Sequence, residues 1–598
     1  MEVARTPPGM VRYRSMSKRH LIGLLTNDLV GTYQYSFWAG MKAAAREEDC
    51  DVVSFNGGEL GSRDPTKSMR NSVFDFVNET KPDALILLAP VVANSTSFSQ
   101  IETFVKSFGT IPLITVGFEI PGHPLMAVNN ASGMDSLIEH LVTVHERKKF
   151  AFVGGPVQNP DAQQRRDTFL RVLARHNIAF DLSMDLVGQF DFGITKMKIA
   201  ELLQNGAEFD ALVAANDEMA LGAMEALKEF GRRIPDDVVV TGFDDIDESS
   251  DSMPALTTVR QPVFEQGKAS LLLALDRIDG TPVSPLTTQM ASLVRRGSCG
   301  CLSTSITEAA RRLPKTDLRT SPSTALGSPD HVASVYEQCA EIVGGSRYAP
   351  HLEELVKAMA VDCLKPGSDT ARSAFVYLVE SAFHADEEND RWQTFLSRLR
   401  IASLRFLPAD PATIFSFEGL VHQMRAMSQE RLGQSIAANA AQLHRWARSM
   451  HESACKMLEK FDDEHMFQTL AQEAKSLQIS TLQFLVREPN LSEGEFRLAL
   501  SIVRGARNNL PPKGAVISFG SALRTITKRS ALRSSVVVEP LYFGGEQLGF
   551  LMMEMVSRRG ALMDSLRGQI SASLMGSRIV NLAREKPSKG KRNEPILA

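Results

Sequence analysis

The stretch ALVAANDEMALGAMEALKEFGRRIPDDVVVTGF, residues 211–243, decides the fold class. It holds two short apolar runs, at 211–215 and 237–243, on either side of an amphipathic segment at 217–231. Strands made of continuous apolar residues are buried on both faces, and a helix between two such strands makes them parallel. The stretch therefore predicts a strand–helix–strand unit in a parallel sheet that helices cover on both sides.

The same alternation continues outward from this unit, from His20 to about Met253. Further apolar runs are HLIGLLT, DVVSF, DALILLA, PLITVG and KFAFVGG, and amphipathic segments lie at 35–48, 131–146 and 161–176. Two series of strands and helices predict two doubly wound lobes. Because ligands of such sheets bind at the carboxyl ends of the strands, we expect a binding site between the lobes.

The composition limits the class of protein. The chain has 598 residues, enough for about three or four domains, and its hydrophobic (43%) and charged (23%) fractions are typical of a soluble globular protein. A net charge of −4 and a pI of about 6.4 give no support for a chain built to bind nucleic acid.

The same counts indicate the compartment. Six cysteines spread over this length cannot form a dense disulfide framework, which indicates a reducing environment. No run of about 18 apolar residues occurs, and the basic N-terminus precedes an apolar run too short for a signal peptide. We therefore expect a cytoplasmic protein that does not contact a membrane, and this argues against an exported solute-binding protein.

Three segments in order carry a family resemblance. They are LIGLLTNDLVGTYQYSFWAGMKAAA (21–45), FVGGPVQNPDAQQRRDTFLRVLARHNI (152–178) and ALVAANDEMALGAMEALKEFGRRIPDDVVVTGFDDIDESSDSMPALTTVRQP (211–262). Together they resemble the ligand-binding core of LacI-family regulators, which implies a two-lobe α/β fold of the type I periplasmic-binding-protein class. The first core strand begins at about residue 20, so the family's N-terminal helix-turn-helix is expected to be missing.

The resemblance also implies the binding residues. Matching positions lie at strand ends or early in helices, where an arginine can fork onto vicinal hydroxyls or a carboxylate and an aromatic ring can stack on a ligand. The implied ligand contacts are Asn27, Tyr33, Gln34, Asn129, Arg165, Phe190, Asn216 and Asp244.

Three neighbouring residues have structural interpretations instead. Asp217 is expected to cap the helix that follows it, because an aspartate at a helix start accepts backbone N–H groups. Asp245 is expected to be structural, and Arg166 to lie on a solvated face.

Signs of metal binding and catalysis are weak. Cys299-Gly300-Cys301 lacks the second pair, or the histidine partners, of a structural zinc site, so an idle thiol pair is the favoured interpretation. Phosphate-binding loops, zinc-protease motifs and nucleophile elbows are absent from the sequence. We therefore expect no metal, no cofactor and no enzymatic activity.

The second half of the chain has a different pattern. Between Leu432 and Met457, apolar residues recur at a 4-3 spacing, which fits either a short coiled coil or an ordinary amphipathic helix packed within the chain. The sequence VVVEPLYFGGEQLGFLMMEM, followed by a helix at about 561–584, resembles the closing half of a GAF-type sensory domain. The predicted divisions are a disordered leader (1–19), the two-lobe domain (20–301), a linker (302–330), a helical region (331–465), an α+β GAF-like domain (466–585) and a disordered tail (586–598).

The most economical hypothesis is a ligand-responsive regulator of the LacI-like type. It would bind a sugar or related metabolite between its lobes, form a homodimer, and signal through its C-terminal helices and GAF-like module to a protein partner. Two alternatives stay open: direct DNA binding through an unrecognised element, and an enzyme with unrecognised chemistry in the C-terminal half.

Overall fold

The computed structural model describes most of the chain between residues 19 and 585. The described ranges are 19–62, 64–94, 96–302, 304–309, 326–340, 342–343, 345–364, 369–383, 390–408, 410–474, 479–503, 505–511, 514–529, 534–554 and 560–585. Nearly all of the predicted leader, the middle of the predicted linker and the whole predicted tail lie outside these ranges.

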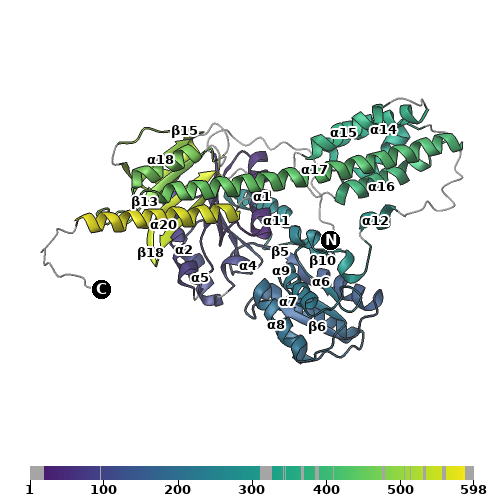
Figure 1. Cartoon of the computed structure of the whole chain (residues 1–598), viewed down its shortest axis with the longest axis horizontal. Helices are drawn as coiled ribbons and strands as arrows, with labels where there is room; N and C mark the ends of the chain where they lie inside the picture. Colours follow the sequence, from purple (N-terminus) through teal and green to yellow (C-terminus); the bar gives the residue numbers. More distant parts are fainter. Residues whose placement is uncertain are drawn as a thin grey trace, which may run out of the picture.

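The first lobe is a parallel sheet with helices on both faces (Figure 1). Its strands, in spatial order, are β11 (Leu286–Met290), β5 (Leu125–Asn129), β4 (Leu113–Val116), β3 (Ala84–Leu88), β1 (Leu21–Thr26) and β2 (Asp51–Asn56). Its helices are α1 (Thr32–Glu47), α2 (Pro65–Arg70), α3 (Val77–Thr80), α4 (Ala89–Val92), α5 (Phe98–Lys106) and α11 (Val263–Ile278).

The second lobe is a smaller parallel sheet in the order β7-β6-β8-β9. These strands span Asp185–Val187, Phe150–Gly154, Ala211–Ala214 and Val239–Thr241, and the helices around them are α6 (Asn130–Thr143), α7 (Pro160–Arg175), α8 (Phe192–Gln204) and α9 (Asp217–Glu229). Every residue of β6, β8 and β9 is buried, as their continuous apolar runs predict.

Three segments cross between the lobes. The chain passes from β5 into α6 at Asn129 and Asn130, from β10 (Thr258–Arg260) into α11 through Gln261, and from β11 into β12 (Ser292–Val294) through Ala291. Strands β10 and β12 pair with each other beside the second lobe. The predicted two-lobe parallel architecture is confirmed.

The described elements between the two-lobe part and residue 474 are helical, in agreement with the sequence pattern. They are α12 (Thr304–Ala309), α13 (Pro329–Cys339), α14 (Ala349–Leu364), α15 (Thr370–Phe383), α16 (Asp390–Leu404), α17 (Pro411–Leu458) and α18 (Asp463–Glu473). Helices α13 to α17 contribute to a hydrophobic core of their own. None of the helices in the described ranges combines the length and the apolar composition needed to cross a bilayer.

Helix α17 joins this bundle to the rest of the molecule. Its 48 residues make it about 72 Å long, and it runs from α14 and α16 at one end to α20 (Gly560–Glu585) at the other (Figure 1). Asp410 caps its start by accepting a hydrogen bond from Thr413 N, and Pro411 occupies the first turn, where no backbone donor is needed.

The predicted seam on α17 packs largely against its own chain. Trp446, Met450 and Met457 are buried, and the two methionines belong to a core that α20 shares. Leu443, in contrast, is 55% exposed. The amphipathic-helix interpretation therefore describes the C-terminal half of this segment.

The last part of the chain is an antiparallel sheet with three helices. Its strands are β13 (Leu482–Val486), β14 (Glu495–Val503), β15 (Ala506–Arg507), β16 (Ala515–Ser518), β17 (Ser535–Phe543) and β18 (Glu546–Glu554), and its helices are α18, α19 (Phe519–Arg529) and α20. The predicted hairpin is confirmed: Phe543 pairs with Glu546 across Gly544 and Gly545, which both have positive φ. We call residues 463–585 the C-terminal unit.

The C-terminal unit continues the sheet of the first lobe. Strand β17 pairs in parallel with β2, from Ser535 opposite Val52 to Val538 opposite Phe55, so that one sheet of 12 strands contains both parts. The two sequence-defined divisions, 20–301 and 466–585, are thus joined through a shared sheet rather than through a linker alone.

The cores on both faces of this sheet are also shared. On one face Ile22 and Val52 belong to the same core cluster as Leu551 and Ile570. On the other, Phe76 of the first lobe stacks on Phe519 with ring centroids 5.0 Å apart and meets the rings of Phe496 and Phe550 edge to face.

A buried ionic network crosses the joint. Arg70, at the end of α2, forms ion pairs with Glu539 on β17 and Asp564 on α20, both at 3.0 Å, and donates to Gly57 O. Asn56 donates to the other oxygen of Glu539. Burial raises the pKa of Glu539, while the Arg70 charge opposes that rise. Removing one partner would leave the other charge buried without compensation.

We predict that Arg70→Ala destabilises the protein by about 3 to 5 kcal/mol, because Glu539 would lose the cation that balances its buried charge. Lys106→Ala is the matched control: Lys106 pairs with Glu102 on the surface of the same lobe and is 76% exposed, so its loss should cost less than about 1 kcal/mol. Chemical denaturation of both variants measures the difference, and equal effects would contradict the proposed role of the network.

Candidate functional site

The carboxyl ends of the second-lobe strands lie on one side of the sheet. Gly155 follows β6, Phe190 follows β7, Asn216 follows β8 and Asp244 follows β9. In parallel sheets this edge is where ligands bind, because the loops that follow the strands converge there.

Arg165 on α7 is the centre of a polar group at this edge. Its side chain is 5% exposed, and its guanidinium lies 3.8 Å from the centroid of the Phe243 ring. It donates to Asn130 Oδ1 at 3.0 Å, to the carbonyl of Ala215 at 2.7 Å and to Asp244 Oδ1 at 3.4 Å. All three contacts use the planar, always charged guanidinium, which a lysine could not reproduce.

Two of these contacts reach segments that cross between the lobes. Asn130 begins α6 directly after the first crossing. Asp244 Oδ1 also accepts a hydrogen bond from Gln261 Nε2 at 2.6 Å, and Gln261 lies in the second crossing. Arg165 is therefore linked to two of the three segments that connect the lobes.

Tyr33 and Asp161 approach this group from either side of the lobe interface. Tyr33 lies in the first turn of α1 in the first lobe, and Asp161 in the first turn of α7 in the second. Burial raises the pKa of Tyr33 well above its usual range, and the charges of Asp161 and Asp244 add to this while Arg165 opposes it. Burial also raises the pKa of Asp161, whose carboxylate accepts from Asn130 Nδ2 at 2.7 Å.

We call these six residues the interlobe cluster: Tyr33, Asn130, Asp161, Arg165, Asp244 and Gln261. A separate hydrogen bond also joins the lobes near it, from Asn159 Nδ2 to Asn94 Oδ1 at 2.8 Å. The cluster contains two carboxylates and one guanidinium, together with amide and phenol groups, which is a suitable set for binding a ligand rich in hydroxyl groups.

The other predicted site residues lie at the same strand ends but bond locally. Asn27 Oδ1 accepts from Gln34 Nε2 at 3.2 Å and from Asp28 N, so these two predicted residues contact each other. Asn129 caps α6 and its amide donates weakly to Met290 Sδ. Phe190 packs against Gly155, where a Cβ would lie 2.4 Å from the ring.

The structure gives Asn216, a predicted ligand contact, the capping role that the sequence assigns to Asp217. Asn216 Oδ1 caps α9 by accepting from Met219 N, whereas Asp217 is fully buried and accepts from Ile246 N and Thr258 Oγ1. The prediction that Asp217 caps the helix is wrong, because the chain enters the helix one residue earlier. Asp245 agrees with its structural interpretation, since it pairs with Arg260 and Arg296.

The interpretation of Cys299 and Cys301 as a thiol pair without histidine partners is also wrong. The fold places His140 and His145 against both cysteines, although 154 or more positions separate them in the sequence. Burial, together with the neighbouring His145 and Arg295, lowers the pKa of His140 to about 4, so this ring is neutral at pH 7. Sequence spacing could not reveal this group, because neither histidine lies near the cysteines along the chain.

Two members of the interlobe cluster, Asp161 and Gln261, were not predicted at all, whereas Asn130 directly follows the predicted contact Asn129. Asp161 follows Asn159 and Pro160 at a helix start, where an acidic residue usually indicates only a favourable interaction with the helix dipole. Gln261 precedes Pro262 in a crossing that only the folded chain reveals.

Comparison with known proteins identifies the class of part of the two-lobe region. Residues 138–299 match the family model of the periplasmic binding protein-like domain. Curated relatives of the chain are named transcriptional regulators. They include the regulator AscG of Escherichia coli (33% identity over 176 residues, 29% of this chain and 52% of AscG) and the probable repressor ExuR of Bacillus subtilis (27% over 264 residues, 43% of this chain and 74% of ExuR).

The ribose operon repressor of Escherichia coli is 23% identical over 300 residues, half of this chain and 87% of the repressor. Among solved structures, the lac repressor dimer bound to operator and an anti-inducer is 23% identical, with a TM-score of 0.41 over 47% of this chain and 95% of the repressor. The chain thus contains a periplasmic-binding-protein-like domain with LacI-family homologues, and it spans only about half the length of AscG.

The ionisation of Asp244 supplies a test of the site without a ligand. Burial raises the pKa of Asp244 from 3.8 to about 6. Because the folded-state pKa is the higher one, protonation stabilises the fold, and that stabilisation is lost as the pH rises from about 4 through 6. We predict that Asp244→Asn gains stability relative to the wild type, on the order of 2 kcal/mol, between pH 4 and pH 7.

Thermal unfolding of both proteins across this pH range measures the difference between them. The variant keeps an oxygen that can accept from Gln261 and Arg165, so the pH dependence of the difference reports the carboxylate alone. If the stability difference between the two proteins does not change with pH, the pKa of Asp244 is the same in the folded and unfolded protein.

Proposed function

We propose that the chain is a ligand-responsive regulator that binds a small polyhydroxylated molecule, a sugar or related metabolite, at the interlobe cluster. The observation that supports this most directly is the placement of Arg165. Its guanidinium lies at the strand ends of one lobe and is hydrogen bonded, directly or through Asp244, to two crossing segments. A ligand that replaces one of these contacts would change the relative stability of two lobe orientations.

The chemistry of the cluster favours hydroxyl groups over charged groups. Carboxylates at Asp161 and Asp244 accept from hydroxyls, while the guanidinium of Arg165 donates to them. The ring of Phe190, half-buried at the end of β7, is available for stacking. The names of two similar proteins point the same way: one is a ribose operon repressor, and another was solved as a complex of the regulator CelR with cellobiose.

The proposed output is regulatory rather than enzymatic, in keeping with relatives that are named transcriptional regulators. The signal would pass through the helices and the GAF-like part of the C-terminal unit to a protein partner in the cytoplasm. Direct contact with DNA through another element is the alternative. To distinguish these outputs, the chain is purified with and without its ligand, and random DNA duplexes are added to one set of samples. A protein that co-purifies would support the partner, and a duplex that co-purifies would support direct DNA contact.

Ligand affinity tests the site. A thermal-shift screen of the full chain against monosaccharides, disaccharides and sugar acids should identify a stabilising compound. We predict that Tyr33→Phe lowers the affinity for that compound by about ten- to a hundredfold, because the phenol hydroxyl contributes a hydrogen bond beside two carboxylates.

Calorimetry on the purified variant measures the affinity. Tyr377→Phe is the matched control, because Tyr377 lies on α15, far from the lobes in sequence, and is 58% exposed. Equal affinities in the two variants would remove Tyr33 from the site, and no stabilisation by any compound of this class would remove the proposed ligand.

We further propose a homodimer that pairs through exposed apolar residues on the long helices. Leu443 on α17 and Leu582 on α20 are 55% and 62% exposed. Light scattering should give twice the chain mass of 65.7 kDa, and Leu443→Arg with Leu582→Arg should return it to one chain mass, because buried unpaired charges are costly. A wild-type mass of one chain at all concentrations would contradict this assembly.

A further inference from the structure

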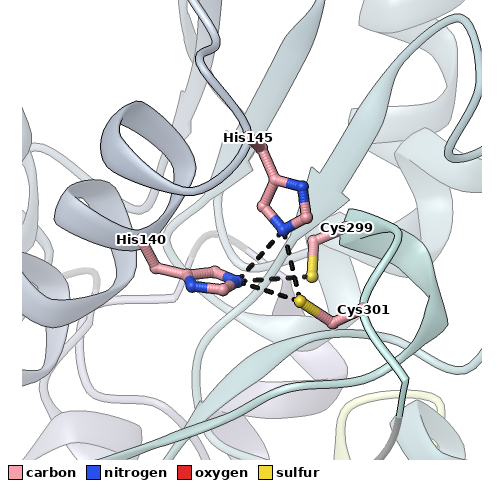
Figure 2. Close-up of side chains that lie close together, drawn as sticks. All are labelled: His140, His145, Cys299 and Cys301. Carbon is pink, nitrogen blue, oxygen red and sulfur yellow. Dashed lines mark hydrogen bonds between the residues drawn. The ribbon is translucent and has the colours of Figure 1, made fainter.

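Two cysteines and two histidines from distant segments converge on one point (Figure 2). His140 lies in the last turn of α6 and His145 in the loop after it, whereas Cys299 ends a short 3-10 turn and Cys301 follows Gly300. One potential ligand atom from each of the four side chains lies within 4.8 Å of the other three. Among the described residues, this is the single group of three or more such side chains.

Four of the six distances between the potential ligand atoms are close to the edges of a metal-centred tetrahedron. The two Nε2 atoms of His140 and His145 are 3.2 Å apart, and Cys301 Sγ is 3.4 Å from the first and 3.3 Å from the second. Cys299 Sγ is 3.7 Å from His140 Nε2. With Zn–N near 2.05 Å and Zn–S near 2.3 Å, tetrahedral edges are about 3.3 Å for N–N and about 3.6 Å for N–S.

The surroundings hold the four side chains in place. Cys299 is fully buried and His140 is 8% exposed. Thr257 Oγ1 donates to Cys299 Sγ at 3.1 Å, and a hydrogen bond of this kind orients a metal ligand. Gly300 has a φ of +94°, a conformation that other residues rarely adopt, and this turn brings both sulfurs to the same side. Two sulfurs and two imidazole nitrogens, each with a lone pair, converge here, and one metal cation can bind all four.

We propose that His140, His145, Cys299 and Cys301 form a structural zinc site. Two thiolates and two neutral imidazoles saturate tetrahedral Zn²⁺ and balance its charge, which leaves no open position for catalysis. The metal would fasten the last residues of the two-lobe part to α6, the helix that begins at the first crossing. It therefore fixes the point on the second lobe from which the chain departs toward α12.

The test uses the full-length chain purified with intact thiols. Elemental analysis after dialysis should find about one zinc per chain, and Cys301→Ser should lower that content at least tenfold. Cys455→Ser is the matched control: Cys455 is exposed on α17 with His451 at 3.8 Å, a cysteine–histidine pair without the other two ligands, so its loss should leave the zinc content unchanged.

Cobalt substitution supports the assignment independently of how the variants fold. The metal-free wild-type chain titrated with Co²⁺ should develop the visible bands of a tetrahedral ion and a thiolate charge-transfer band, and one equivalent of Zn²⁺ should abolish both. His145→Gln, at a half-buried position outside the core, should lower the intensity of the thiolate-bound tetrahedral spectrum. A zinc content below a tenth per chain together with no tetrahedral cobalt spectrum would overturn the proposal, as would equal zinc loss in Cys301→Ser and Cys455→Ser.

Discussion

The pairing of β2 with β17 is the constraint on which the rest of the architecture depends. Without it, β2 would be the edge of the first-lobe sheet, although all six of its residues are buried. An exposed apolar edge is a site for aggregation, and proteins cover such edges. Here the cover comes from a strand about 480 residues later in the chain, fastened by backbone pairing, by Asp51 accepting from Ser534 N, and by the Arg70–Glu539 ion pair. The C-terminal unit is therefore part of the first lobe's fold.

The β2–β17 pairing determines which parts of the molecule would move together if the lobes rotated. The first lobe and the C-terminal unit share a sheet and two cores, so they should move as one body, while the second lobe moves about the crossings. The helical bundle is attached to both bodies: α17 runs to it from the C-terminal unit, and the chain leaves the second lobe at residue 301 toward α12, which packs on α16. A rotation of one lobe against the other would thus displace the two attachments of the helical bundle, α17 and the chain after residue 301, relative to each other. The proposed zinc site makes the second attachment stiff.

The sequence predicts the helices and strands of this structure better than the contacts that join them. Periodicity and apolar runs identify helices α1, α6, α7 and α9 to within a few residues and most strands of both lobes, because these patterns are local. The family resemblance, not the periodicity, names Tyr33, Arg165 and Asp244; the structure places the three in one polar group, and their role in ligand binding stays a prediction. The β2–β17 pairing, the Asp161 and Gln261 contacts and the His140–Cys301 group all join residues more than 15 positions apart in the chain. No local pattern encodes such contacts, and one sequence without relatives cannot reveal them.

The charges at the interlobe cluster explain why a ligand should act there. Asp161 and Asp244 both have raised pKa values because burial disfavours their charges, and Arg165 only partly offsets this cost. The folded protein therefore holds two carboxylates under electrostatic strain beside the crossings. A ligand that donates hydroxyl hydrogen bonds to them lowers this cost only in the lobe orientation that brings it into contact with both carboxylates. Its differential affinity for that orientation is then the free energy available for signalling. Under the proposed function, the buried anionic pair would couple recognition of a neutral, hydroxyl-rich molecule to a rotation of the lobes.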